Sequence, residues 1–97
     1  MMNMLSGILD GLEKLEGVER DREILRIGMV AELDAVSIYE QMASMTDNQD
    51  IKKVLKDVSK EEKTHVGEFE SLLKKIDEEY TEELDAGKKE VDELIQD

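Results

Sequence analysis

The chain has 97 residues, no cysteine, no proline, and a formal net charge of −13 from 26 acidic and 13 basic side chains. The absence of cysteine excludes a disulfide scaffold, a zinc–thiolate site and a thiol nucleophile. The acidic charge argues against nucleic acid and anionic membranes as partners. No apolar run approaches the ~20 residues of a membrane span, and the first residues do not resemble a secretory signal. We therefore expect a cytoplasmic protein.

The composition is typical of long helices, because aromatic residues make up only 3% of the chain and charged residues 40%. We predict an all-α protein with a single domain over residues 1–97. A helical chain of this size gains little from its own core. Without disulfides, such a chain usually needs a metal or a partner subunit for stability.

Three segments follow one another along the chain. In residues 1–17, leucine and isoleucine recur at positions 5, 8, 9, 12 and 15, which predicts a short amphipathic helix that breaks at Gly17. Residues 20–76 form the predicted hairpin, in which a helix from near Glu19 to about Met45 is followed by a short turn and a second helix. Residues 80–97 form a predicted acidic C-terminal helix, with a kink or break at Gly87 as an option.

The first hairpin helix carries two apolar stripes. We expect one stripe to face inward and the other to flank it. The inward stripe is Ile24, Ile27, Ala31, Ala35, Ile38, Met42 and Met45; the flanking stripe is Leu25, Gly28, Met29, Glu32, Val36 and Tyr39.

Two polar residues interrupt the apolar stripe of the second helix. Glu62 and His65 occupy consecutive steps of this stripe, between Val58 and Phe69. A buried carboxylate and imidazole cost several kcal/mol unless a charge or a metal compensates them. Their spacing of three residues places both side chains on one face. An inward-facing Glu-x-x-His pair is the half-motif of helical di-iron and di-manganese sites.

The hairpin brings a third residue to the same level. Glu32 lies 15 residues before Asp47 in the turn and Glu62 lies 15 residues after it, so both are ~22 Å from the turn. Taken singly, such a histidine is usually a hydrogen-bonded core residue, and such a glutamate usually pairs with a lysine. The coincidence of all three favours a metal site. One hairpin supplies half of a di-iron site, so we predict a twofold homodimer with bridging Glu62, terminal Glu32 and capping His65.

The segments AELDAVSIYEQMA and VSKEEKTHVGEFESLL resemble the encapsulated ferritins, half-length ferritin-like proteins found inside, or fused to the shell protein of, encapsulin nanocompartments. The resemblance covers roughly residues 20–76. It implies that Glu32, Glu62 and His65 are ferroxidase ligands at a dimer interface, with Tyr39 beside them. It also implies a decameric ring of dimers whose iron product is stored by the encapsulin shell.

The sequence departs from this family at two points. Some members carry glutamates immediately before and two residues after the ligand glutamate, which form an outer site where metal enters; here these positions are Ala31 and Asp34. Asp34 alone keeps part of that site. The ELIQD terminus lacks the shell-docking peptide of separate cargo proteins. The chain is thus either the domain of a shell fusion or docks through another segment, such as LSGILDGLEKL.

The predicted activity is oxidation of Fe(II) to Fe(III) by oxygen or peroxide, with two iron ions per dimer. The same ligands also accept manganese, zinc or calcium. Tyr39 either orients a ligand carboxylate or is a tyrosine at the edge of the core. The alternative functions are a rubrerythrin-like peroxide reductase, a structural dimer that is only fastened by metal, and a metal-free assembly module.

Overall fold

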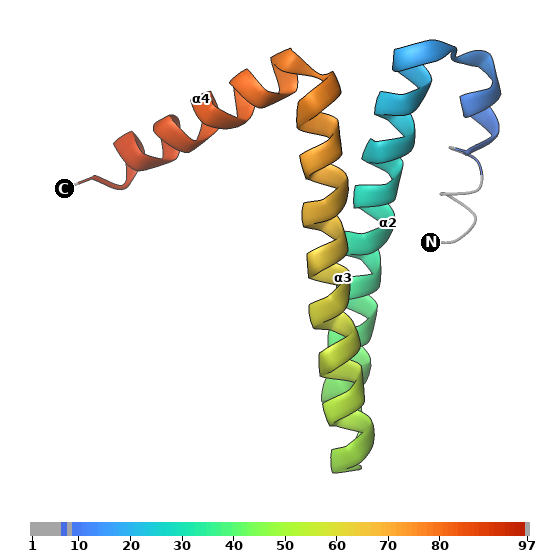
Figure 1. The fold of residues 1–97 in the computed structure, drawn as a ribbon. Helices are drawn as coiled ribbons and strands as arrows, with labels where there is room; N and C mark the ends of the chain where they lie inside the picture. The colour runs from blue at the N-terminus through green and yellow to red at the C-terminus, as the bar shows by residue number, and fades with distance from the viewer. Residues whose placement is uncertain (1–6, 8, 97) are drawn as a thin grey trace.

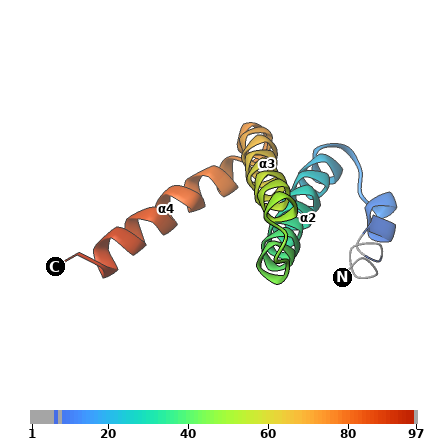
Figure 2. The ribbon, with the colours of Figure 1, turned by 90° about the horizontal axis from the view of Figure 1, so that it is seen from below.

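The structure is a computed structural model that describes Gly7 and residues 9–96. These residues form helices and no strands, which confirms the predicted all-α fold. A 3-10 helix η1 (Gly11–Lys14) precedes three α-helices, α2 (Gly17–Met45), α3 (Gln49–Ile76) and α4 (Glu78–Leu94). Helices α2 and α3 pack against each other as a long antiparallel hairpin (Figure 1). Helix α4 leaves the hairpin on the side of α3, and η1 lies on the side of α2 (Figure 2).

Local signals set the ends of the hairpin helices. Gly17 has a φ of 57° at the start of α2, in the left-handed region that glycine adopts without strain. This helix begins two residues before Glu19, the predicted start. At the turn, the Asn48 side chain accepts hydrogen bonds from the backbone N–H groups of Asp50 and Ile51 at 3.0 and 3.1 Å. Asn48 therefore caps α3 and fixes the register of its first turn.

The two terminal segments agree with prediction only in part. In the described part of residues 1–17, Gly7, Leu9 and Asp10 are helical and a 3-10 helix of four residues follows, while positions 5 and 8 of the predicted amphipathic helix lie outside the described residues. Arg20 holds the 3-10 helix, because its Nε donates to the Leu12 carbonyl at 3.2 Å. The possible break at Gly87 is wrong, since α4 continues through this residue to Leu94. A glycine inside an exposed helix costs only about 1 kcal/mol, which does not end the helix.

The hairpin has a very small core. Among the described residues, the buried hydrophobic side chains are Ile27, Ala43 and Leu73. The chain exposes 7613 Å², whereas a compact monomer of 11.1 kDa exposes about 5,700 Å². Its radius of gyration is 16.8 Å, against about 12.5 Å for a compact domain of this length. The hairpin is therefore a single layer that lacks a second layer to cover it.

Both stripes of α2 contain residues that pack within the chain, because Ile27 of the expected inward stripe is buried. Gly28, from the flanking stripe, faces α3, because a Cβ added there lies 3.2 Å from two ring carbons of Phe69. Ile24 and Met42, from the expected inward stripe, are exposed. The pattern predicted the two apolar stripes but not which of their residues are buried. Part of the stripe that was expected to face inward, including Ile24 and Met42, is exposed.

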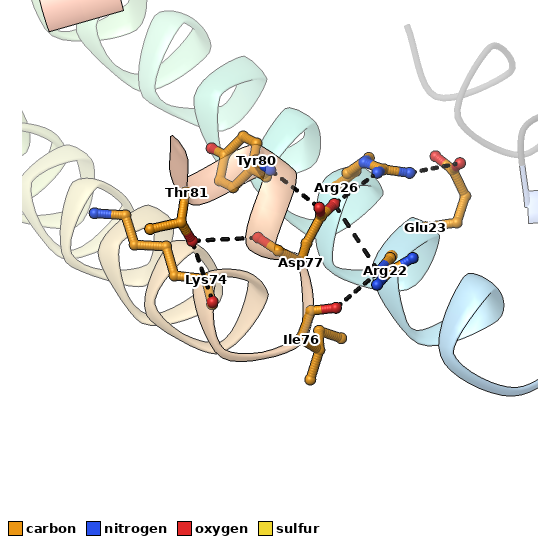
Figure 3. A network of polar contacts seen from close by, with 8 residues as sticks. All are labelled: Arg22, Glu23, Arg26, Lys74, Ile76, Asp77, Tyr80 and Thr81. Carbon is orange, nitrogen blue, oxygen red and sulfur yellow. Dashed lines mark hydrogen bonds and ion pairs between the residues drawn. The ribbon is translucent and has the colours of Figure 1, made fainter. Parts of the chain in front are cut away.

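A polar network fixes the junction between α3 and α4 (Figure 3). Asp77 is only 7% exposed and its Oδ1 accepts a hydrogen bond from the Tyr80 backbone N–H at 3.0 Å, which caps α4. Its other oxygen, Oδ2, accepts from Arg26 Nη2 at 3.0 Å. Arg22 Nε donates to the Ile76 carbonyl at 2.8 Å. Two arginines of α2 thus hold the end of α3 and the start of α4.

Candidate metal centre

Glu32, Glu62 and His65 meet near the middle of the hairpin. One ligand atom from each side chain lies within 4.8 Å of the others. The Nδ1 atom of His65 lies 3.4 Å from Glu32 Oε2 and 3.6 Å from Glu62 Oε2. The structure thus brings together the three side chains that the sequence placed at one level.

The position of the cluster follows from the hairpin geometry. Glu62 and His65 are one turn apart on α3, and Glu32 comes from the facing turn of α2. The cap at Asn48 begins α3 directly after the turn, which sets the number of residues between the turn and Glu62. An insertion in either arm would rotate its ligands by about 100° per residue around the helix axis.

The side chains of the cluster are partly exposed. The side chains of Glu32 and Glu62 are 20% and 19% exposed, and that of His65 is 43% exposed. Val54 and Leu72 lie on the same side of α3 as His65, at intervals of eleven and seven residues, and both are exposed. Apolar side chains that the described part of the chain leaves exposed therefore lie along α3 on both sides of the cluster.

The donor set fits a metal such as iron. Two carboxylates and one imidazole are ligands that suit iron and manganese, and three protein ligands leave coordination positions open. Dinuclear sites in helical bundles use four glutamates and two histidines from four helices. This hairpin presents two glutamates and one histidine, which is half of that set.

Two other predicted site residues lie outside this cluster. Asp34 is half-buried and follows Glu32 by two residues, so its side chain projects from a different side of α2. Tyr39 is half-buried and lies two turns after Glu32. Asp34 contributes no atom to the metal-ligand cluster of the described chain. Their roles as outer metal site and carboxylate-orienting group stay predictions.

A second polar contact between the arms was not predicted. The Ser59 hydroxyl donates to Glu40 Oε1 at 3.2 Å, and Lys63 Nζ lies 2.9 Å from the same oxygen. Ser59 is buried, although serine is usually exposed. The signal in the sequence was weak, since a small polar residue in a lysine-rich segment is also expected of a solvated helix face.

The fold and this cluster together define a class: an all-helical, ferritin-like protein with a carboxylate–histidine cluster on a helical hairpin. Comparison with known proteins agrees. The rubrerythrin family matches residues 23–95. The crystal structure of the encapsulated ferritin domain from Pyrococcus furiosus superposes with a TM-score of 0.81 at 47% identity, covering 84% of this chain and 83% of that one.

Two further relatives are similar in sequence. The ferritin-like–encapsulin shell fusion protein of Pyrococcus furiosus is 51% identical over 72 residues, which are 74% of this chain and 21% of the fusion protein. The encapsulin nanocompartment cargo protein EncC of Myxococcus xanthus is 38% identical over 66 residues, which are 68% of this chain and 50% of EncC. The chain thus spans about a fifth of the length of the shell fusion protein and half of the length of EncC.

The chain belongs to the rubrerythrin family, and within it to the encapsulin-associated ferritin-like proteins. The resemblance drawn from its two sequence segments is therefore confirmed. None of the helices in the described part of the chain is long and apolar enough to cross a membrane.

Proposed function

We propose that this protein is a ferroxidase that binds Fe(II) at Glu32, Glu62 and His65 and oxidises it to Fe(III). The observation that carries the proposal is the convergence of three partly exposed side chains, one ligand atom of each lying within 4.8 Å of the others. Iron is the substrate of this reaction. Membership of a family of ferritin-like proteins supports iron over the other metals that these ligands accept.

The proposed site is completed by a second copy of the chain. One hairpin supplies half of the usual ligand set, and the exposed Ile24, Met42, Val54 and Leu72 lie on the two helices that carry it. A twofold axis beside the cluster places two identical half-sites together. We propose two iron ions per dimer, with Glu62 shared between them. The same contact buries the apolar faces that a single chain leaves open.

The reaction needs little from the protein beyond binding. Two Fe(II) ions each give up one electron, and dioxygen accepts two electrons and is reduced to peroxide. The carboxylates of Glu32 and Glu62 stabilise the higher charge of Fe(III) more than that of Fe(II), which favours oxidation. His65 adds a neutral donor. Tyr39 is proposed to orient a ligand carboxylate by donating its hydroxyl hydrogen, and Asp34 to attract incoming Fe(II).

The proposed location is the interior of an encapsulin compartment in the cytoplasm. One relative is a fusion to an encapsulin shell and another is an encapsulin cargo protein. We propose that an encapsulin shell protein is the partner of this chain and that dimers assemble into a larger ring, a decamer. In this arrangement the shell stores the Fe(III) that the ring releases.

Anaerobic iron titration followed by exposure to oxygen tests the proposal. We expect about one Fe(II) per chain, formation of a dimer or larger assembly, and a rise in ferric absorbance when oxygen is admitted. Glu62→Ala and His65→Ala should lose binding and oxidation. Glu61→Ala is the matched control, because Glu61 is the exposed neighbour of Glu62 on the same helix and should retain both.

Each alternative function predicts a different result. Metal binding without faster oxidation than in buffer would indicate a structural dimer. Oxidation by peroxide alone would indicate a peroxide reductase. Iron binding that is absent, or unchanged in Glu62→Ala and His65→Ala, would reject the assigned site.

A further inference from the structure

A hollow of about 490 Å³ lies between α2 and α3 near the turn end of the hairpin. Its wall is formed by Lys52, Lys56, Lys60 and Lys63 of α3, and its other lining residues are Glu40, Ala43, Ser44 and Ser59. We call it the lysine hollow. Lys56 precedes His65 by nine residues, which is two and a half helical turns, so the two side chains point to opposite sides of α3. The lysine hollow is therefore separate from the candidate metal centre.

The lysine hollow concentrates positive charge in a chain of net charge −13. Lys52, Lys56 and Lys60 follow one another at intervals of four residues, which places like charges side by side on the helix. Each such pair destabilises the helix by a few tenths of a kcal/mol. In the described part of the chain, none of these three lysines has a carboxylate oxygen within 4 Å, although the sequence holds 26 acidic residues. No ion pair in the described part of the chain offsets the repulsion among them.

The single carboxylate that lines the hollow already forms an ion pair with a lysine. Glu40 Oε1 lies 2.9 Å from Lys63 Nζ and accepts the Ser59 hydroxyl hydrogen at 3.2 Å. The contact with Lys63, followed by that with Ser59, lowers the pKa of Glu40 below its ordinary value of 4.5. Glu40 therefore stays ionised and neutralises Lys63. The charge that remains in the hollow is that of the other three lysines.

The shape of the hollow comes from small side chains. Ala43, Ser44 and Ser59 line it, and large side chains at these positions would fill the space. The Ser44 hydroxyl donates to the Gln41 carbonyl at 2.7 Å and the Ser59 hydroxyl donates to Glu40. Both hydroxyl hydrogens are therefore in use. The lysine ammonium groups, each with three donors, are the groups that can bind a ligand here.

These observations select the class of ligand. Ammonium groups without acceptors bind oxyanions, and phosphate is a common ligand for lysine. Lys52 and Lys60 are eight residues apart, so their attachment points are separated by about 12 Å along the helix. This distance is longer than a single phosphate and fits a chain of several linked phosphates. We propose that the lysine hollow binds phosphate oxyanions in the form of a short linear polyphosphate.

Calorimetric titration of the full, iron-free chain with tripolyphosphate and, separately, with orthophosphate tests this inference. Iron is omitted because phosphate also binds ferric iron. We expect about one tripolyphosphate per chain and weaker binding of orthophosphate at the same phosphorus concentration. The Lys56→Gln, Lys60→Gln double variant should bind tripolyphosphate at least tenfold more weakly. The matched control is Lys88→Gln with Lys89→Gln on exposed α4, which removes the same charge elsewhere and should bind normally.

Several results would overturn the inference. These are the absence of binding by either phosphate, equal loss in the two double variants, and equally tight binding of a glutamate peptide. If orthophosphate binds as tightly as tripolyphosphate, the ligand is a single phosphate, and the proposed polyphosphate is wrong. Circular dichroism checks that the variants are folded. The inference does not rest on the ferroxidase function, because the iron titration of the lysine variants is an independent measurement.

Discussion

Arg26 and Asp77 are 51 residues apart in the sequence, and they form a hydrogen-bonded ion pair of 3.0 Å between Nη2 and Oδ2. The pair connects the first half of α2 to the residue at which α3 ends and α4 begins. Asp77 is buried while the Arg26 side chain is 47% exposed. The carboxylate is therefore the partner whose loss the structure tolerates least.

We expect Asp77→Ala to lower the free energy of unfolding by about 1–2 kcal/mol, because it removes the cap of α4 and leaves two arginines without this counter-ion. Asp77→Asn should lie between Asp77→Ala and the unmutated protein, since an amide oxygen still caps the helix. Urea unfolding at one fixed protein concentration measures the difference. Asp85→Ala, at an exposed position of α4, is the control and should change the free energy by less than about 0.5 kcal/mol. Equal effects at the two positions would contradict the assigned role of Asp77.

Gly28 allows α2 and α3 to approach closely at the Phe69 ring. Alanine in a helix is favoured over glycine by about 1 kcal/mol, but a Cβ at Gly28 lies 3.2 Å from two ring carbons. The Phe69 ring would have to shift, which costs about 1–3 kcal/mol in a packed contact. Gly67→Ala is the control, since nothing lies within 4 Å of its added Cβ. We expect Gly28→Ala to be at least about 1 kcal/mol less stable than Gly67→Ala in urea unfolding. If the two variants are equally stable, the Phe69 ring moves aside without cost.

Tyr80 makes the free energy of unfolding depend on pH in the alkaline range. Burial, followed by the charge of Glu70 and its hydrogen bond at 3.5 Å, raises the pKa of the Tyr80 phenol above its ordinary value of 10.0. The folded state thus favours the neutral phenol, and this contribution is complete below pH 10.0 and is lost as the pH rises through the higher pKa of the folded protein. Thermal unfolding between about pH 9 and about pH 12 should show a smaller fall in Tm for Tyr80→Phe than for the unmutated protein. Glu70→Gln should fall between them, and identical curves for all three proteins would contradict the coupling.

Asp34 is expected to act on the rate of iron uptake and not on the amount bound. Its side chain lies outside the cluster of three ligands, so Asp34→Asn should leave the number of iron ions at saturation unchanged. Loss of one negative charge near the site should slow ferric absorbance a few-fold at limiting Fe(II) and low salt, where charges steer cations most strongly. Asp57→Asn removes an exposed carboxylate from α3 and is the control. A lower stoichiometry in Asp34→Asn would make Asp34 a ligand, and an unchanged rate would remove it from the uptake route.

The sequence predicted the features that depend on helical periodicity alone. The hairpin, its turn near Asn48 and the common level of Glu32, Glu62 and His65 follow from equal arm lengths and a fixed rise per residue. Which residues of the two α2 stripes are buried could not be predicted this way. Both stripes are apolar, and the close contact of Gly28 with Phe69 joins residues that are distant in the sequence.

Contacts between distant residues also explain what the sequence missed. Asp77 falls between the predicted hairpin and the predicted C-terminal helix, and nothing in its neighbours indicated contacts with two arginines from α2. The lysine hollow likewise depends on small residues of α2 lying opposite lysines of α3. The residues that form each of these features can be identified only once it is known how α2 and α3 pair.

A small rotation at the Asp77 junction would cause a large displacement of the far end of α4. The helix has 17 residues and is therefore about 25 Å long. A rotation of only ten degrees at Asp77 would move the far end by about 4 Å, which is most of a helical turn. Contacts between unlike surfaces close into a ring only at particular angles and otherwise produce open filaments. In any assembly built through α4, the angular precision of Arg22 and Arg26 at its base would decide between a closed particle and a fibre.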